Sequence, residues 1–224
     1  KIAKIIGREN QINFFNKIGF YNRVNTDFLE AAAPLGNKNN WGEMETMTIG
    51  FGHGFAVTPM HLAIAYSILL NGGQEVGPKF ISRNNKSIQK TANQIIKKKT
   101  SDYVLKLLRA VVLETEYTGP RVKIEGYDVG GKTGTAEKAT VGGYTRKAKV
   151  NTFVSIFPTS KPKYVMVVLL DEPKTSEDYI YKYKNKSGSY KGTPFNTAGW
   201  TSVEVTGKII QKIGPILATK YIEN

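Results

Sequence analysis

The strongest constraint on the fold is an apolar run at residues 165–170, Val-Met-Val-Val-Leu-Leu. Its β-branched, nearly continuous composition is typical of a strand in the interior of a sheet. Two more extended segments precede it, at residues 127–138 and 151–157, and only short breaks separate the three. Short breaks join antiparallel strands, because parallel strands need a crossover connection of a dozen or more residues. We therefore predict an antiparallel sheet.

Helical periodicity surrounds these segments. Five helices are predicted from apolar residues that recur every three or four positions: residues 2–6, 12–18, 59–70, 101–112 and 203–217. The start of the third helix is predicted most clearly. Thr58 can cap its first turn, and Pro59 lacks only an N–H that would be unpaired there. Residues 21–48 and 173–197 are predicted to be irregular loops, and the polar residues 75–99 an exposed hairpin or loop. This order predicts one α/β domain, an antiparallel sheet flanked by helices.

The composition excludes several classes of protein. An apolar fraction of 40% is too high for a wholly disordered chain, and the lack of Cys excludes thiolate metal sites and Cys nucleophiles. The net charge of +14 raises the question of an anionic partner. However, only six of the 32 basic residues are Arg, which grips phosphates and guanine edges, and the Lys residues are scattered. We expect a solvated Lys-rich surface and no nucleic-acid partner.

The segment that carries chemistry is residues 129–136, Val-Gly-Gly-Lys-Thr-Gly-Thr-Ala. On a strand, Lys132 and Thr133 face opposite sides of the sheet. The glycines remove side-chain bulk, so that a ligand or another backbone can approach. A Lys, two hydroxyls and backbone N–H groups on a strand edge suit an anionic or acyl substrate, whose carboxylate and developing oxyanion they would stabilise. An ordinary Gly-rich strand that ends in a turn is the alternative.

Several stretches in a fixed order support the chemical interpretation. Around its Lys-Thr-Gly motif, the chain resembles the transpeptidase domain of class B penicillin-binding proteins, most closely the division-specific type of Gram-negative bacteria. The matching stretches are residues 49–59, 71–73, 108–112, 126–136 and 171–173. The resemblance implies an α/β fold like that of penicillin-binding proteins and serine β-lactamases. It also implies a serine acyltransferase without cofactor or metal, which cross-links peptidoglycan stem peptides at D-Ala-D-Ala and is a target of β-lactams.

The resemblance also implies a role for each residue of the motif. Lys132 would lie opposite the nucleophile, hold the substrate carboxylate and relay protons. The hydroxyls of Thr133 and Thr135 would bind the carboxylate of the stem peptide or of a β-lactam. The backbone N–H of Thr135 would form half of the oxyanion hole, and Gly134 would leave room for the acyl group.

The nucleophile of this family is not found in the sequence. Two Ser-x-x-Lys strings, at Ser87 and Ser160, and the Ser-x-Asn string at Ser82 lack the apolar helix start that would activate a Ser and lower the pKa of a Lys. In the family these motifs precede a stretch like residues 1–5. We therefore expect residues 1–224 to be the C-terminal portion of a transpeptidase domain, inactive without the missing N-terminal part of the same protein.

The resemblance places such a protein at the periplasmic face of the bacterial inner membrane, with its anchor outside this chain and membrane proteins of the division complex as partners. An elongation-specific enzyme or a bifunctional synthase is an alternative within the family. A non-catalytic module of the same fold that binds glycan or protein is an alternative outside it. His53, in a Gly-rich turn, and His61, in a helix, have no acidic neighbours at ligand spacing, so they predict structural roles rather than a metal site.

Overall fold

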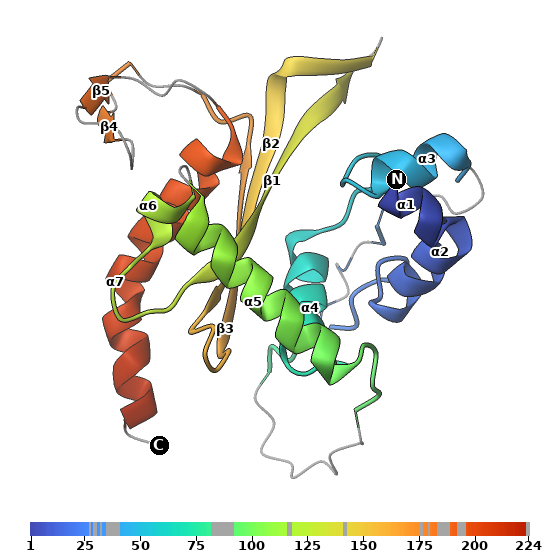
Figure 1. Ribbon diagram of the computed structural model, residues 1–224, viewed down its shortest axis with the longest axis horizontal. Helices are drawn as coiled ribbons and strands as arrows, with labels where there is room; N and C mark the ends of the chain where they lie inside the picture. The colour runs from blue at the N-terminus through green and yellow to red at the C-terminus, as the bar shows by residue number, and fades with distance from the viewer. Residues whose placement is uncertain are drawn as a thin grey trace. The chain divides into compact units, whose positions relative to one another are not determined.

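The computed structural model divides the chain into two compact units, Lys1–Tyr103 and Val104–Asn224. It describes residues 1–26, 28, 31, 33–34, 41–81, 92–115, 118–140, 143–174, 177–178, 180–182, 189–191 and 196–222. The first unit is helical in its described part, and the second contains the sheet (Figure 1). Helix α5 (Lys98–Glu114) begins in the first unit and ends in the second.

The first unit begins with two helices, α1 (Ile2–Ile6) and α2 (Arg8–Lys17), as predicted. Gly7 separates them with a φ of 78°, a left-handed conformation that favours glycine. Helix α4 (Pro59–Leu70) confirms the predicted start, since the Thr58 Oγ1 accepts the N–H of His61 at 3.4 Å and Pro59 occupies the first turn. The local cap signals therefore set the start of this helix.

Helix α3 (Glu43–Ile49) contradicts the prediction of an irregular stretch at residues 21–48. Its seven residues are too few for a helical period to stand out. The helix is stabilised instead by a cap at its N-terminal end, where the Glu45 carboxylate accepts the Gly42 N–H at 2.9 Å. The preceding Trp41 is buried, and its indole N–H donates to the Thr46 hydroxyl at 3.1 Å. A cap and one buried aromatic residue define this helix.

The second unit contains a three-stranded antiparallel sheet in the order β1-β2-β3. Its strands are β1 (Gly130–Thr140), β2 (Gly143–Phe157) and β3 (Tyr164–Asp171). The antiparallel sheet confirms the sequence prediction, while β2 begins earlier than expected. The interior position predicted for the strand at 165–170 is wrong, because among the described residues β2 is the central strand and β3 pairs with β2 alone. In the register, Thr135 lies opposite Asn151 and Val154 opposite Val167.

The core of the second unit lies where helix α7 (Ser202–Ile222) packs on the sheet (Figure 1). Phe153 and Phe157 point from one face of β2 into a cluster with Val203 and Ile210 of α7. This helix is the predicted closing helix. The short helix α6 (Gly119–Val122) adds another fully buried side chain, Val122, to the same cluster. Burial of such a cluster is the main stabilising contribution to the unit.

The predicted loop at residues 173–197 contains two short strands that the sequence did not indicate, β4 (Ile180–Lys182) and β5 (Ser189–Lys191). They form a separate two-stranded antiparallel ladder. A 3₁₀ turn, η1 (Ala198–Trp200), then leads into α7. Three-residue strands show too little alternation to be recognised from sequence.

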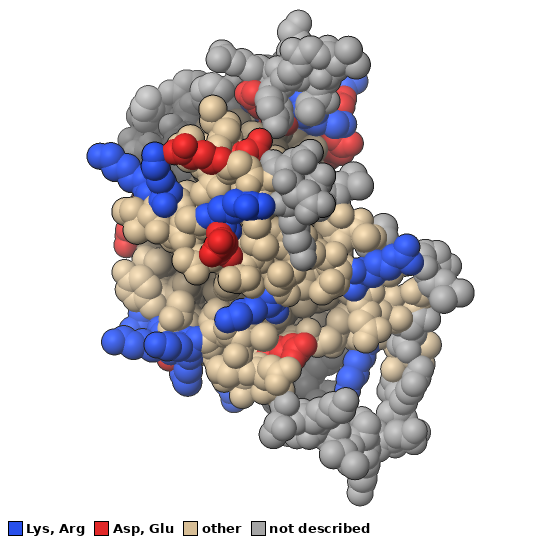
Figure 2. Space-filling model, turned by 90° about the vertical axis from the view of Figure 1, so that its right-hand side faces the viewer, with Lys and Arg blue, Asp and Glu red and all other residues tan. Residues whose placement is uncertain are grey.

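The basic residues form no continuous patch on the face drawn in Figure 2, where blue side chains lie apart and red ones lie among them. Several pair with carboxylates in the described part of the chain. Lys4 lies 2.6 Å from Glu43, and Lys138 lies within 3.0 Å of Asp171 and 2.7 Å of Glu172. Across the described residues, the helices all fall short of the length and apolar character that a membrane span requires.

Candidate active site

Strand β1 lies at one edge of the three-stranded sheet. Within the described residues it pairs with β2 alone, so every second residue of β1 presents its backbone N–H and C=O to an unpaired edge. The segment from Lys132 to Thr135 lies in the first half of this strand. An extended ligand could add to such an edge through main-chain hydrogen bonds.

The four predicted site residues alternate between the two faces of β1, as the sequence analysis expected. Lys132 lies opposite Val154 in the register, and Thr133 opposite the buried Phe153. Lys132, Gly134 and Thr135 are exposed, and Thr133 is half-buried. The Lys132 ammonium donates to the carbonyl oxygen of Thr133 at 2.8 Å. The strand therefore presents a cation and two hydroxyls within four consecutive residues.

The glycines of the motif have two different roles. A Cβ on Gly131 would lie 2.5 Å from Cζ of Phe153 and 2.5 Å from the carbonyl oxygen of Val154. A Cβ on Gly130 would lie 2.6 Å from Cγ2 of Thr159. These two glycines therefore let the chain pack on itself. Gly134 differs, because a Cβ there would lie 3.9 Å from Cβ and from the carbonyl oxygen of Thr152, at ordinary van der Waals distance. The space beside Gly134 is open to a ligand.

The Thr135 hydroxyl is fixed by the turn that precedes α7. Its Oγ1 accepts the backbone N–H of Ala198 at 3.1 Å. A hydroxyl carries one hydrogen and two lone pairs, so accepting this bond leaves its own hydrogen available as a donor. On an exposed residue of an open strand edge, that hydrogen suits an anionic oxygen of a ligand.

An ion pair anchors the start of β1. Asp128, at a φ of 46°, binds the Arg109 guanidinium at 2.8 Å and accepts the Ser160 N–H at 2.7 Å. Burial alone would raise the pKa of the Asp128 carboxyl, but hydrogen bonds from Thr159 and Ser160 and the charge of Arg109 outweigh it and lower that pKa. The same arrangement accounts for Ser160: it lies in the β2–β3 connection and not at a helix start. It therefore lacks the setting of a nucleophile.

The other predicted decoys, Ser82 and Ser87, lie outside the described residues. Asp171 and Glu172, at the end of β3, are exposed and paired with Lys138, the arrangement of a solvated strand end. The described residues contain no cluster of three or more metal-ligating side chains.

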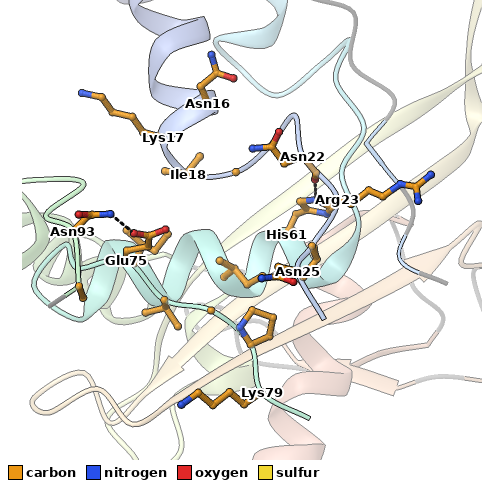
Figure 3. Close-up of a pocket in the computed structure, with 18 residues that line it drawn as sticks. Asn16, Lys17, Ile18, Asn22, Arg23, Asn25, His61, Glu75, Lys79 and Asn93 are labelled. Carbon is orange, nitrogen blue, oxygen red and sulfur yellow. Dashed lines mark hydrogen bonds between the residues drawn. The ribbon is translucent and has the colours of Figure 1, made fainter. Parts of the chain in front are cut away.

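The first unit contains a cavity of about 840 Å³ (Figure 3). His61 lines it, and both ring nitrogens are used: Nδ1 lies 2.7 Å from the Thr58 hydroxyl, and Nε2 lies 2.9 Å from the carbonyl oxygen of Asn22. This confirms the structural role predicted for His61. Asn93 donates to Glu75 at 2.7 Å, while Lys17 and Arg23 point away from the middle of the cavity. The described residues that line it include no Ser, Thr, Cys or Tyr, so they supply no hydroxyl or thiol nucleophile.

Comparison with known proteins defines the class of protein to which the chain with this strand edge belongs. Residues 1–196 match the family model described as "Penicillin binding protein transpeptidase domain". The chain therefore belongs to the family of penicillin-binding-protein transpeptidase domains, and the α/β fold predicted from the resemblance is confirmed.

Particular relatives agree with this assignment. The chain is 30% identical over 226 residues to the "Probable peptidoglycan D,D-transpeptidase FtsI" of Caulobacter vibrioides, covering 98% of this chain and 36% of that protein. A solved structure, the apo transpeptidase domain of Burkholderia pseudomallei penicillin-binding protein 3, aligns with a TM-score of 0.69 and 31% identity over 77% of this chain and 52% of that one. The Mycobacterium tuberculosis penicillin-binding protein 3 complexed with ampicillin aligns with a TM-score of 0.71 at 22% identity, over 95% of this chain and 47% of that one, a likeness of fold. The chain thus spans about a third of the curated relative.

The sequence analysis missed one residue at this site. Asn151 is fully buried opposite Thr135, and its side chain binds the segment that carries Ala198. A signal existed, because Asn151 alternates with the apolar Phe153 and Phe157 on the buried face of β2. A polar residue in such a series marks a buried hydrogen-bonding role.

Proposed function

We propose that this chain is part of a serine-type D,D-transpeptidase that cross-links peptidoglycan stem peptides. The observation that carries the proposal is the exposed Lys-Thr-Gly-Thr segment on an unpaired strand edge, in a chain of the transpeptidase family. The curated relative from Caulobacter, named as a peptidoglycan D,D-transpeptidase, supports the same activity.

In this reaction a Ser hydroxyl attacks the carbonyl carbon of the D-Ala-D-Ala amide and loses its proton to a base. The tetrahedral intermediate expels the terminal D-Ala as a protonated amine, which leaves an acyl-enzyme. An amine on a neighbouring stem peptide then attacks the ester and releases the serine. Each half-reaction passes through an oxyanion that backbone N–H donors stabilise.

Four residues of β1 would serve these steps. The Lys132 ammonium would attract the terminal carboxylate of the substrate and take part in proton transfer near the nucleophile. The hydroxyls of Thr133 and Thr135 would donate to that carboxylate, and the Thr135 N–H would supply half of the oxyanion hole. The open space at Gly134, where a Cβ would approach no atom closer than 3.9 Å, would accommodate the acyl group.

The nucleophile would come from a part of the full-length protein outside residues 1–224, which would form the C-terminal portion of the transpeptidase domain. The position of Ser160 supports this, because it lies in an exposed turn between β2 and β3 and not at the start of an apolar helix. By itself the chain would then bind substrate weakly and form no acyl-enzyme.

β-Lactams would be acylating inhibitors, since their strained amide and carboxylate mimic the scissile end of the stem peptide. The ampicillin complex of a protein with the same fold supports this class of ligand. We further propose that the full-length protein works at the periplasmic face of the inner membrane with membrane proteins of the division complex. The resemblance of the sequence to the division-specific type favours a septal role over elongation.

Covalent labelling by a fluorescent penicillin tests the proposal. The full-length protein should be labelled on one Ser, Lys132→Ala should abolish labelling, and Lys163→Ala should serve as a matched surface control that leaves it intact. The 224-residue chain alone should remain unlabelled. Label mapped to a Ser of this chain would contradict the missing nucleophile, and a full-length protein without label would favour a non-catalytic module.

A further inference from the structure

The turn before α7 is tied to the middle of the sheet by one buried side chain. The Asn151 amide nitrogen donates to the carbonyl oxygen of Asn196 at 2.8 Å and to the Thr201 hydroxyl at 2.8 Å. The Thr201 hydroxyl in turn donates to the carbonyl oxygen of Thr197 at 2.9 Å. A single amide group thus holds both ends of the segment from residue 196 to residue 201.

The middle of that segment reaches the candidate active site. Its Ala198 N–H donates to Oγ1 of Thr135 at 3.1 Å, and Thr135 lies directly opposite Asn151 in the β1–β2 register. Ala198 is itself fully buried, so the donor has little room to move. The position of Asn151 therefore determines which lone pair of the Thr135 hydroxyl is occupied, and hence where its hydrogen can point.

Asn151 lowers the stability of the fold through one of its side-chain atoms. It is fully buried, and its Oδ1 has no hydrogen-bond partner within the described part of the structure. A buried acceptor without a partner destabilises the fold, and the next residue along the same face of β2, Phe153, is apolar. An apolar side chain would avoid this cost. The benefit of Asn151 must therefore come from the two hydrogen bonds of its amide nitrogen.

We propose that Asn151 is a positioning residue for recognition of the substrate carboxylate. Through residues 196–201 it fixes the Ala198 N–H against Thr135, so that the Thr135 hydroxyl directs its hydrogen outward as a donor to an anionic ligand. This inference rests on the proposed function, because it assigns Asn151 to the same strand edge. It goes further by adding a residue that touches no substrate and acts through Thr135.

The experiment compares two β-lactams on the full-length protein: benzylpenicillin, which carries the carboxylate, and its methyl ester, which does not. Asn151→Leu keeps the side chain similar in size, makes it apolar and removes both hydrogen bonds donated by the amide nitrogen. Thr201→Val removes one acceptor from a partly exposed site and is the milder variant. Ser155→Ala is the matched control, since Ser155 is equally buried on the same face of β2 but binds only the carbonyl oxygen of Met166, at 3.4 Å.

The expected result is a selective loss. Asn151→Leu should lower the second-order acylation rate by benzylpenicillin about tenfold or more, the scale of one charge-assisted hydrogen bond, and leave the rate with the ester unchanged. Thr201→Val should show the same selectivity with a smaller effect, and Ser155→Ala should match the wild type. In a Thr135→Val background, Asn151→Leu should add no further loss.

Three outcomes would overturn the inference: equal losses with acid and ester, which indicate a merely structural role; an unchanged rate in Asn151→Leu; or additive losses with Thr135→Val. Failure of the proposed function has a different signature, because the wild type itself would then react with neither compound.

Discussion

Replacement of Gly131 by Ala should destabilise the sheet, although it adds only one methyl group. The new Cβ would lie 2.5 Å from both Cζ of Phe153 and the carbonyl oxygen of Val154. The Phe153 ring is fully buried and the Val154 oxygen belongs to the partner strand, so neither can give way easily. Overpacking of this kind costs about 1–3 kcal/mol. In a chain of this size each kcal/mol corresponds to a fall in Tm of about 2–4 °C.

The matched control is Gly134→Ala, three residues along the same strand. Its Cβ would come no closer than 3.9 Å to Thr152, and the loss of glycine's flexibility in the unfolded chain favours the folded state by about 0.4–1 kcal/mol. Thermal unfolding of the two variants, followed by circular dichroism, should therefore give a lower Tm for Gly131→Ala and an equal or higher Tm for Gly134→Ala. Equal decreases in both would refute the assignment of different roles to the two glycines.

Three further predictions concern the supports of the site. Phe153→Ala should cost about 3–5 kcal/mol by leaving a cavity between the sheet and α7, measured by denaturant unfolding. Thr58→Ala should cost about 1 kcal/mol by removing the cap of α4; the same loss from Thr100→Ala, at an exposed position within α5, would argue against a cap effect. The lowered pKa of Asp128 means that its hydrogen bonds from Thr159 and Ser160 and its ion pair with Arg109 together stabilise the fold above the ordinary carboxyl pKa of 3.8, and that this contribution is lost as the pH falls through the folded-state value. Asp128→Asn should therefore lower the unfolding midpoint at pH 7 and converge with the wild type in strong acid; a difference that persists there would contradict the linkage.

The sheet and the long helices could be predicted because their signals are local and repeated. Six consecutive apolar residues predict the strand at 165–170, and Thr58 and Pro59 predict the start of α4. Helix α3 could not be predicted, because it is defined by the buried Trp41 and by the Glu45 cap and not by a repeat of apolar residues. Tertiary contacts decide such short elements.

The candidate site divides in the same way. The segment from Lys132 to Thr135 could be found from sequence, since its residue types and order are specific in context. A buried hydrogen-bonding role for Asn151 could be suspected from its polar side chain in an apolar strand. Its link to Thr135 could not be predicted, because that link depends on a strand register and on a turn 45 residues later in the chain. The separate roles of Gly131 and Gly134 also required knowing which atoms face each glycine.

The central claim is that the edge of β1 from Lys132 to Thr135 holds the carboxylate of an acylating ligand. A crystal structure of the full-length protein acylated by ampicillin tests it directly. The account predicts the ligand carboxylate within hydrogen-bonding distance of the Thr133 or Thr135 hydroxyl, and the ester carbonyl oxygen on the Thr135 N–H. An ampicillin molecule bound through its ester to a Ser elsewhere, with no contact to β1, would contradict it.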